Sequence, residues 1–244
     1  MFKLKILGAA AAVLIGTGAA SAVTFSVDAI SGSWQNTVLA GGGTASGEGT
    51  GSIRWGDPAT SNGPSGYDFT GAATPLSADP DELFILGTFN HLNFPVFPPS
   101  LVSADLTVSI EGMVENVGFA FDSVFSFDHF ETPNNASPCA IPGTVSPCPD
   151  LVTLLNAQDT TQIVTVGDTD FTLEIAGFVT DPLDPSSFLN SFTTLENENN
   201  QAFLVGRFSQ PIVEVAPVPL PAAGWMLFAG LGALGLARRK RKAV

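Results

Sequence analysis

From Thr24 onward, hydrophobic and polar residues alternate along the chain with a period of two rather than 3.6. The stretch 170–175 places Phe171, Leu173 and Ile175 on one parity. A longer extended run repeats this alternation, and its apolar members are Val117, Phe119, Phe121, Phe125 and Phe127. Because successive side chains of a strand point to opposite faces, the pattern predicts β-strands with one buried face.

The same alternation predicts further strands, with clusters of Gly, Pro, Asn and Asp between them. They cover Thr24–Ile30, Trp34–Leu39, Gly51–Gly56, Leu83–Phe89, Leu106–Ile110, Gln162–Val166 and Ala202–Phe208. One short helix is expected at Asp150–Asn156. About nine short strands between residues 23 and 210 favour an all-β domain, an antiparallel two-sheet sandwich or a jelly-roll-like fold. The 19 phenylalanines are expected to fill its core.

The first 22 residues have the three parts of a secretory signal peptide, and they predict a signal helix. The charged start, the apolar run and the cleavage site are, in order, Lys3 and Lys5, Ile6–Ala20, and Ala20-Ser21-Ala22. A cleavage site of this small-residue type is cut by signal peptidase after Ala22. We therefore expect export across the inner membrane and a mature chain that begins at Val23.

The C-terminal segment predicts a single membrane helix with a basic end. A linker at residues 211–217 leads to Val218-Pro219-Leu220-Pro221, then to an apolar span at 222–237 and a basic cluster at 238–242. At 1.5 Å per residue the span is about 24 Å long, and basic side chains that snorkel extend its reach. Positive charge after a span marks the cytoplasmic side, so residues 23–210 are expected to lie outside.

This tail, residues 218–244, resembles the PEP-CTERM class of sorting signals in its VPLPA variant. The motif, a span that opens with Gly224-Trp225 and the basic cluster occur in the order typical of that class. The resemblance implies recognition by exosortase, a membrane-embedded transpeptidase-like enzyme, in a Gram-negative bacterium. It further implies transient anchoring by the span, removal of the tail, and transfer of the body to the envelope surface or an extracellular matrix such as a biofilm polysaccharide.

Charge is distributed unevenly along the chain. All 23 acidic residues lie between Asp28 and Glu214, whereas Arg54 and Arg207 are the basic residues of that stretch. Nucleic-acid binding needs a basic footprint, so it is excluded for this body. The acidity keeps an exported domain soluble, and it leaves calcium as a cofactor that the surface tolerates.

The two cysteines, Cys139 and Cys148, lie in a proline-rich segment. Export to an oxidising compartment favours a disulfide between them. A metal site made by the cysteines is disfavoured, because they lack the C-x-x-C spacing and have no neighbouring histidine.

A second resemblance lies in the body. The segment Leu86–Val96 contains Asn90-His91-Leu92-Asn93 and is similar to the signature of the THxN family of PEP-CTERM proteins and the related choice-of-anchor K domain. Supporting segments are Ile53–Gly56, Phe127–Asn134 and Cys148–Asp150. The resemblance implies an exported protein of the surface or matrix and assigns no reaction.

The polar residues of these segments have two interpretations. In the first, His91 and Asn93 lie in a turn before Pro95 and bond to nearby backbone, and His129 shares the core parity of Phe125 and Phe127. In the second, His91, Asn93, His129 and Glu131 form a cation or sugar site. Calcium prefers oxygen ligands, which are offered by Glu131, Asn134, Asp150 and the pair Asp168/Asp170.

No catalytic motif is found: the chain has no G-x-S-x-G elbow and no H-E-x-x-H. The leading hypothesis is a non-catalytic structural or adhesive protein of the cell surface or extracellular polymer. A carbohydrate-binding module, with Trp34, Trp55 or Tyr67 as exposed stacking platforms, is the alternative. A polysaccharide hydrolase with two facing carboxylates is the third hypothesis.

Overall fold

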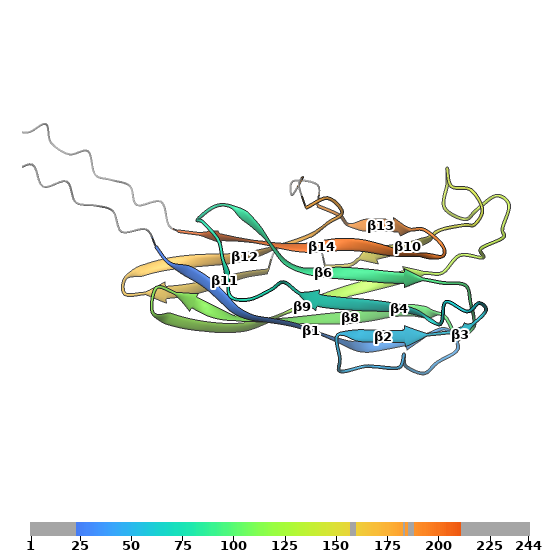
Figure 1. The fold of residues 1–244 in the computed structure, drawn as a ribbon, viewed down its shortest axis with the longest axis horizontal. Coiled ribbons are helices and arrows are strands. Elements are labelled where there is room, and N and C mark those ends of the chain that lie inside the picture. Colours follow the sequence, from blue (N-terminus) through green and yellow to red (C-terminus); the bar gives the residue numbers. More distant parts are fainter. Residues whose placement is uncertain (1–22, 157–159, 183, 185–187, 211–244) are drawn as a thin grey trace, which may run out of the picture. The chain divides into compact units, whose positions relative to one another are not determined.

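The structure is a computed structural model that describes residues 23–156, 160–182, 184 and 188–210. These residues belong to one unit of the chain, Met1–Gln210. Their secondary structure consists of strands, shown in Figure 1. The expected signal helix at 1–22 and membrane helix at 222–237 lie outside the described residues. Within the part that is described, no helix is long and apolar enough to cross a membrane.

Two six-stranded antiparallel sheets make up the fold. The first has the strand order β13 (Ser191–Thr194), β10 (Asp150–Leu154), β9 (Val117–Phe130), β8 (Leu101–Val114), β1 (Phe25–Leu39) and β5 (Leu76–Ser77). The second has the order β11 (Thr160–Val166), β12 (Thr169–Val179), β14 (Glu198–Ser209), β6 (Leu83–Asn93), β4 (Ser65–Gly71) and β2 (Ser52–Trp55). A small ribbon pairs β3 (Asp57–Pro58) with β7 (Val96–Phe97). An all-β fold of two antiparallel sheets is therefore confirmed.

The two sheets enclose one hydrophobic core because their strands bury alternate residues. On β9 the inward parity carries Phe125 and Phe127, and on β6 it carries Phe89. The rings of Phe89 and Phe127 stack across the sheets with centroids 5.5 Å apart. Apolar area removed from water in this way is the main favourable term in folding.

Both chain ends of the described domain lie at the same end of the sheets. Phe25, at the start of β1, stacks on Phe208, near the end of β14, with ring centroids 4.3 Å apart. The backbone of Thr24 also accepts a hydrogen bond from Glu115, in the turn that joins β8 to β9. From that turn β9 runs away from the termini (Figure 1), so its last residues lie a strand length, roughly 40 Å, from them.

The structure corrects two predictions about local structure. The segment predicted as a helix at Asp150–Asn156 contains β10 instead, because Asp150, Val152 and Leu154 alternate inward and pair the strand with β9 and β13. The strand predicted to end at Phe89 continues to Asn93. A five-residue strand between two partners is held by ladder hydrogen bonds, which local propensity does not include.

Cys139 and Cys148 are joined in a disulfide, with their Cα atoms 5.5 Å apart. The bond closes the loop between Glu131 and β10, and Cys148 is fully buried at the base of that loop. The backbone N–H of Cys148 also donates to the carbonyl oxygen of Asn134 at 2.9 Å. The disulfide therefore fixes the path of the chain directly before Asp150.

We expect the double substitution Cys139→Ala/Cys148→Ala to lower the free energy of unfolding by about 2.7 kcal/mol, because the unfolded chain regains the entropy of an open loop. Urea denaturation of the oxidised wild type and the variant would measure the difference. Val145→Ala is the matched control, since Val145 lies in the same loop and is 80% exposed. Equal stability of wild type and double variant would contradict the prediction.

Candidate functional site

Polar side chains gather between the two sheets, at the end away from the chain termini. His91 and Asn93 follow Phe89 on the inward parity of β6, and His129 follows Phe127 on the inward parity of β9. The two imidazole rings therefore meet across the sheets, with centroids 5.1 Å apart. We call this group the polar cluster; its members are Trp55, Tyr67, His91, Asn93, His129, Glu131, Asp150 and Glu196.

His129 is held from both sides of its ring. Nδ1 shares a hydrogen bond of 2.7 Å with the hydroxyl of Tyr67, on β4. Nε2 lies 3.4 Å from Oε2 of Glu131 and 3.9 Å from Oδ2 of Asp150. Tyr67 thus fixes the ring so that Nε2 faces two carboxyl groups.

Asp150 is placed by the backbone around it. The N–H of Thr132 donates to Oδ1 of Asp150 at 2.7 Å. The hydroxyl of Thr132 donates to the carbonyl oxygen of Pro149 at 2.9 Å, so the backbone directly before Asp150 is held as well. Asn93 is oriented in a similar way, because its Nδ2 donates to the carbonyl oxygen of Thr194 at 2.9 Å.

Two carboxyl groups of the cluster, those of Asp150 and Glu196, have pKa values raised above their ordinary range. Burial, followed by the charge of Glu131, raises the pKa of Asp150 from 3.8 to about 8, against the opposing hydrogen bond from Thr132. Burial and the charge of Glu131 also raise the pKa of Glu196 from 4.5 to about 7. Oxygens of Glu131, Asp150 and Glu196 lie within 4.8 Å of one another, and Asp150 and Glu196 are buried.

The aromatic members form the walls of the cluster. His91 lies between the ring of Trp55, with centroids 5.8 Å apart, and the ring of Tyr67, at 5.0 Å. Burial, and then the neighbouring His129, lower the pKa of His91 well below 6.5, so the ring is neutral. Burial, followed by the charges of Asp150 and Glu131, raises the pKa of Tyr67, so its hydroxyl keeps its proton.

Several buried polar atoms of the cluster have no hydrogen-bond partner among the described residues. They are Nε1 of Trp55, both ring nitrogens of His91, Oδ1 of Asn93, Oδ2 of Asp150 and both carboxyl oxygens of Glu196. An unsatisfied buried polar group costs about 1–3 kcal/mol, and native structures contain few. Their concentration at one place marks the cluster as the candidate functional site.

Of the four residues predicted as a ligand site, the structure brings together His91, His129 and Glu131, and Asn93 follows His91 on the inward parity of β6. The structure places His91 and Asn93 within β6 and not in a turn. Sequence reasoning missed the partnership of Asp150 with the histidines, although the segment Cys148–Asp150 had been singled out. Glu196 and Tyr67 carried no sequence signal for this site, since they come from other strands and loops.

The pair Asp168/Asp170 lies elsewhere, at the β11–β12 hairpin, where Asp170 accepts a hydrogen bond from the hydroxyl of Thr165. The prediction of exposed stacking platforms is wrong: Trp34, Trp55 and Tyr67 are 0%, 3% and 0% exposed. Their rings pack on the inner faces of the sheets, where large aromatic side chains contribute most to the core.

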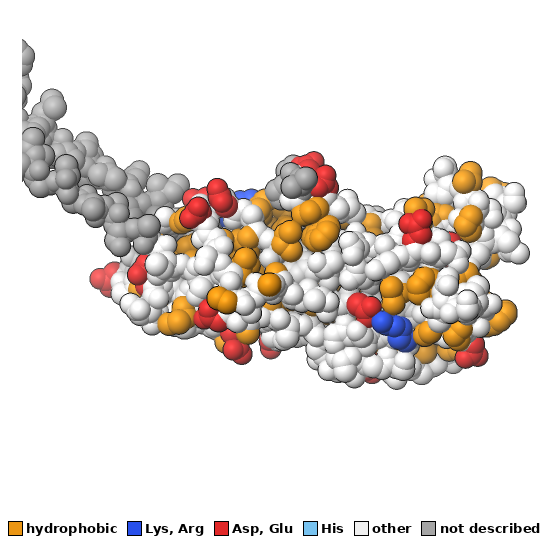
Figure 2. All heavy atoms as spheres, in the orientation of Figure 1, with side chains coloured by type: hydrophobic (Ala, Val, Ile, Leu, Met, Phe, Trp, Pro, Cys, Tyr) orange, Lys and Arg blue, Asp and Glu red, His pale blue; other side chains and the backbone are white. Residues whose placement is uncertain are grey.

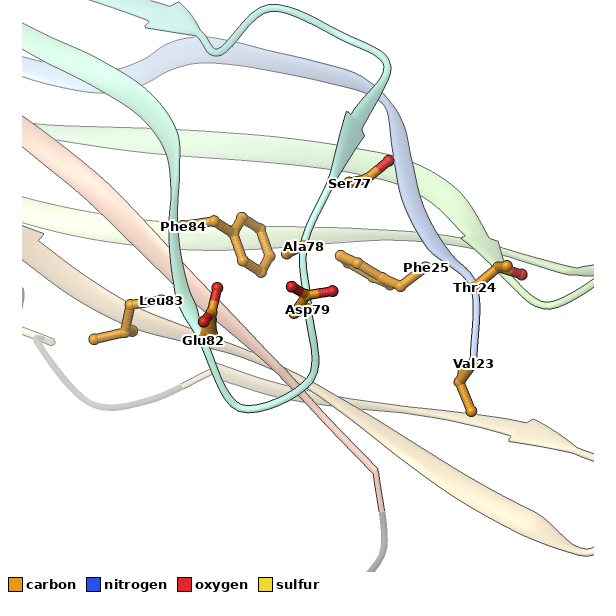
Figure 3. Close-up of a pocket in the computed structure, with 9 residues that line it drawn as sticks. All are labelled: Val23, Thr24, Phe25, Ser77, Ala78, Asp79, Glu82, Leu83 and Phe84. Atoms are coloured by element: carbon orange, nitrogen blue, oxygen red, sulfur yellow. The ribbon is translucent and has the colours of Figure 1, made fainter. Parts of the chain in front are cut away.

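The surface hollow lined by Phe25 and Phe84 has fewer titratable side chains than the polar cluster. The hollow in Figure 3 has a volume of about 380 Å³ and lies beside the start of β1, where Phe25 and Phe84 face Asp79 and Glu82. Apart from these two carboxylates its lining is small or apolar. On the face shown in Figure 2, acidic side chains are dispersed and basic ones are few.

The described residues thus define an acidic, disulfide-bonded β protein with a polar cluster between its two sheets. Residues 217–242 match the PEP-CTERM protein-sorting motif. This match implies exosortase-dependent export, transient membrane anchoring and surface localisation of the chain. No curated protein matches the chain. The resemblance of the body to the THxN family and the choice-of-anchor K domain stays a prediction from its segments.

Proposed function

We propose that the protein is a non-catalytic structural or adhesive component of the envelope surface or extracellular polymer. The sorting motif at 217–242 is the observation that carries this proposal, because it implies export and sorting to the cell surface. The fold fits such a role, since its two antiparallel sheets share one large core and a disulfide closes the loop beside the polar cluster. Disulfides persist in the oxidising conditions outside the inner membrane.

The position of the chain ends fits a domain presented from a surface. Residues 23 and 210 lie at one end of the sheets, and the polar cluster lies at the other. In the proposed sequence of events, signal peptidase cuts after Ala22 and the span at 222–237 holds the domain at the membrane. Exosortase then removes the tail, and the domain is retained in the envelope or the extracellular polysaccharide.

Fractionation of cells that carry two different tail variants tests this proposal. Deletion of residues 218–244 is expected to leave a soluble exported domain, because the apolar span is lost. Pro219→Ala/Pro221→Ala keeps the span but changes the motif, so uncleaved protein is expected to accumulate in the inner membrane. Leu236→Ala, within the span, is the control and is expected to be sorted as the wild type is. Wild-type sorting of the proline variant would overturn the proposal, and so would recovery of an intact 238–244 peptide from the surface form.

A further inference from the structure

We propose that His91, His129 and Asp150 hold one divalent transition-metal ion of the zinc class between the two sheets. One ligand atom from each of these residues lies within 4.8 Å of the others. The three side chains come from β6, β9 and β10, so the ion would join strands of both sheets. This inference is independent of the sorting of the chain and of its role at the surface.

The distances suit a zinc-class ion after small side-chain movements. Zinc binds nitrogen and carboxylate oxygen at about 2.0–2.2 Å, so tetrahedral ligand atoms lie roughly 3.3–3.6 Å apart. Nε2 of His129 and Oδ2 of Asp150 are already 3.9 Å apart. A second group of carboxyl oxygens, from Glu131, Asp150 and Glu196, also lies within 4.8 Å and shares Asp150 with the first. Glu131 and Glu196 therefore adjoin the site through Asp150, and one of them would have to move toward the histidines to supply a fourth ligand.

The buried atoms without partners point to the same position. His91 is 0% exposed, and neither of its ring nitrogens has a hydrogen-bond partner among the described residues. Oδ2 of Asp150 lies 3.9 Å from Nε2 of His129 and likewise has no hydrogen-bond partner among the described residues. A neutral imidazole and a carboxylate are the groups that bind such ions. One ion would give a ring nitrogen of His91 and Oδ2 of Asp150 the partner that each of these atoms lacks among the described residues.

Tyr67 orients His129 in the manner of a metal ligand. In protein metal sites the second ring nitrogen of a histidine ligand is commonly hydrogen-bonded, which fixes the tautomer and the ring orientation. The bond between Nδ1 of His129 and the hydroxyl of Tyr67, at 2.7 Å, leaves Nε2 for the ion. Two imidazoles also favour zinc over calcium, which takes six to eight oxygen ligands. This differs from the calcium that the acidic sequence suggested.

The chain contains two histidines, and both lie in the cluster. The mature protein is purified without a histidine tag and treated with chelator. Its imidazole NMR signals then come from this site alone. We expect one equivalent of Zn²⁺ to shift the signals of both rings and to raise the melting temperature. Ca²⁺ at the same concentration is expected to do neither. Unchanged ring signals with Zn²⁺, or a response to Ca²⁺ alone, would overturn the proposal.

Two variants separate metal binding from packing. His91→Phe keeps an aromatic ring between Trp55 and Tyr67 but has no nitrogen, so we expect a folded protein whose melting temperature no longer responds to Zn²⁺. Tyr67→Phe keeps the ring and removes the hydroxyl, and should weaken zinc binding roughly 10–100-fold. Asp168→Asn, at an exposed hairpin position, is the matched control and should bind as the wild type does. Full zinc response in folded His91→Phe would contradict the proposed site, and the wild-type NMR titration decides the question if this variant does not fold.

Discussion

In metal-free buffer, the free energy of unfolding should fall as the pH is raised from about 4 to about 8. Unfolded Asp150 loses its proton near pH 3.8, whereas burial and the charge of Glu131 keep it protonated in the folded state to about pH 8. Between these values unfolding releases a proton, so a higher pH favours the unfolded state. A pKa difference of this size corresponds to an effect on the order of 5 kcal/mol, and Glu196, whose pKa is raised to about 7, acts in the same direction.

Urea denaturation at several pH values, with chelator present, measures this dependence. The titratable groups that face Asp150 are His91, His129, Glu131, Glu196 and Tyr67. Asp150→Asn keeps an oxygen that can accept from Thr132 but does not titrate, so its stability should change much less over the same range. Repulsion among the other acidic residues acts in both proteins, so it cancels when the free energy of unfolding of the variant is subtracted from that of the wild type. If the free energy of unfolding fell equally with pH in the wild type and the variant, Asp150 would not be the source of the pH dependence.

The second large effect is expected in the core, where Phe89→Ala should lower the free energy of unfolding by about 3–5 kcal/mol. Phe89 is 0% exposed and contacts the rings of Tyr67 and Phe127, with centroids 4.9 and 5.5 Å away. Truncation removes this buried area and leaves a cavity that the rigid sheets cannot close. For a domain of this size the melting temperature should fall by roughly 10 °C.

Phe97→Ala is the matched control for this experiment. Phe97 lies in the short strand β7 and is 62% exposed, so its truncation should cost less than about 1 kcal/mol. Thermal and urea denaturation of the three proteins at one pH would provide the comparison. A loss for Phe89→Ala no larger than that for Phe97→Ala would mean that the core does not depend on this ring.

The strands with strong alternation were predictable because their side chains follow one rule along the chain. Phe125, Phe127 and His129 share a parity on β9, and the structure places all three inside. The short strands β10 and β13 were not predictable in this way. Their pairing, for example Val152 opposite Phe192, depends on partners about 40 residues away in the sequence. Local propensity carries no information about such partners.

The candidate site was predictable in part for the same reason. His91, Asn93, His129 and Glu131 could be grouped from two sequence segments, but their surroundings could not. The register of β6 with β4 places Tyr67 directly opposite His91, which gives His129 its hydrogen-bond partner. Trp55 and Tyr67, expected on the surface, are walls of the cluster because their strands turn these rings inward.

The sequence by itself implied sorting of this protein to the cell surface and determined the class of its fold. A sorting motif is read as a linear segment, and alternation with a period of two is a local property of each strand. Tertiary structure alone decided that Asp150 meets two histidines and that buried polar atoms remain unpaired around them. Those properties arise from contacts across two sheets, where the distance between side chains depends on register and packing and not on separation along the chain.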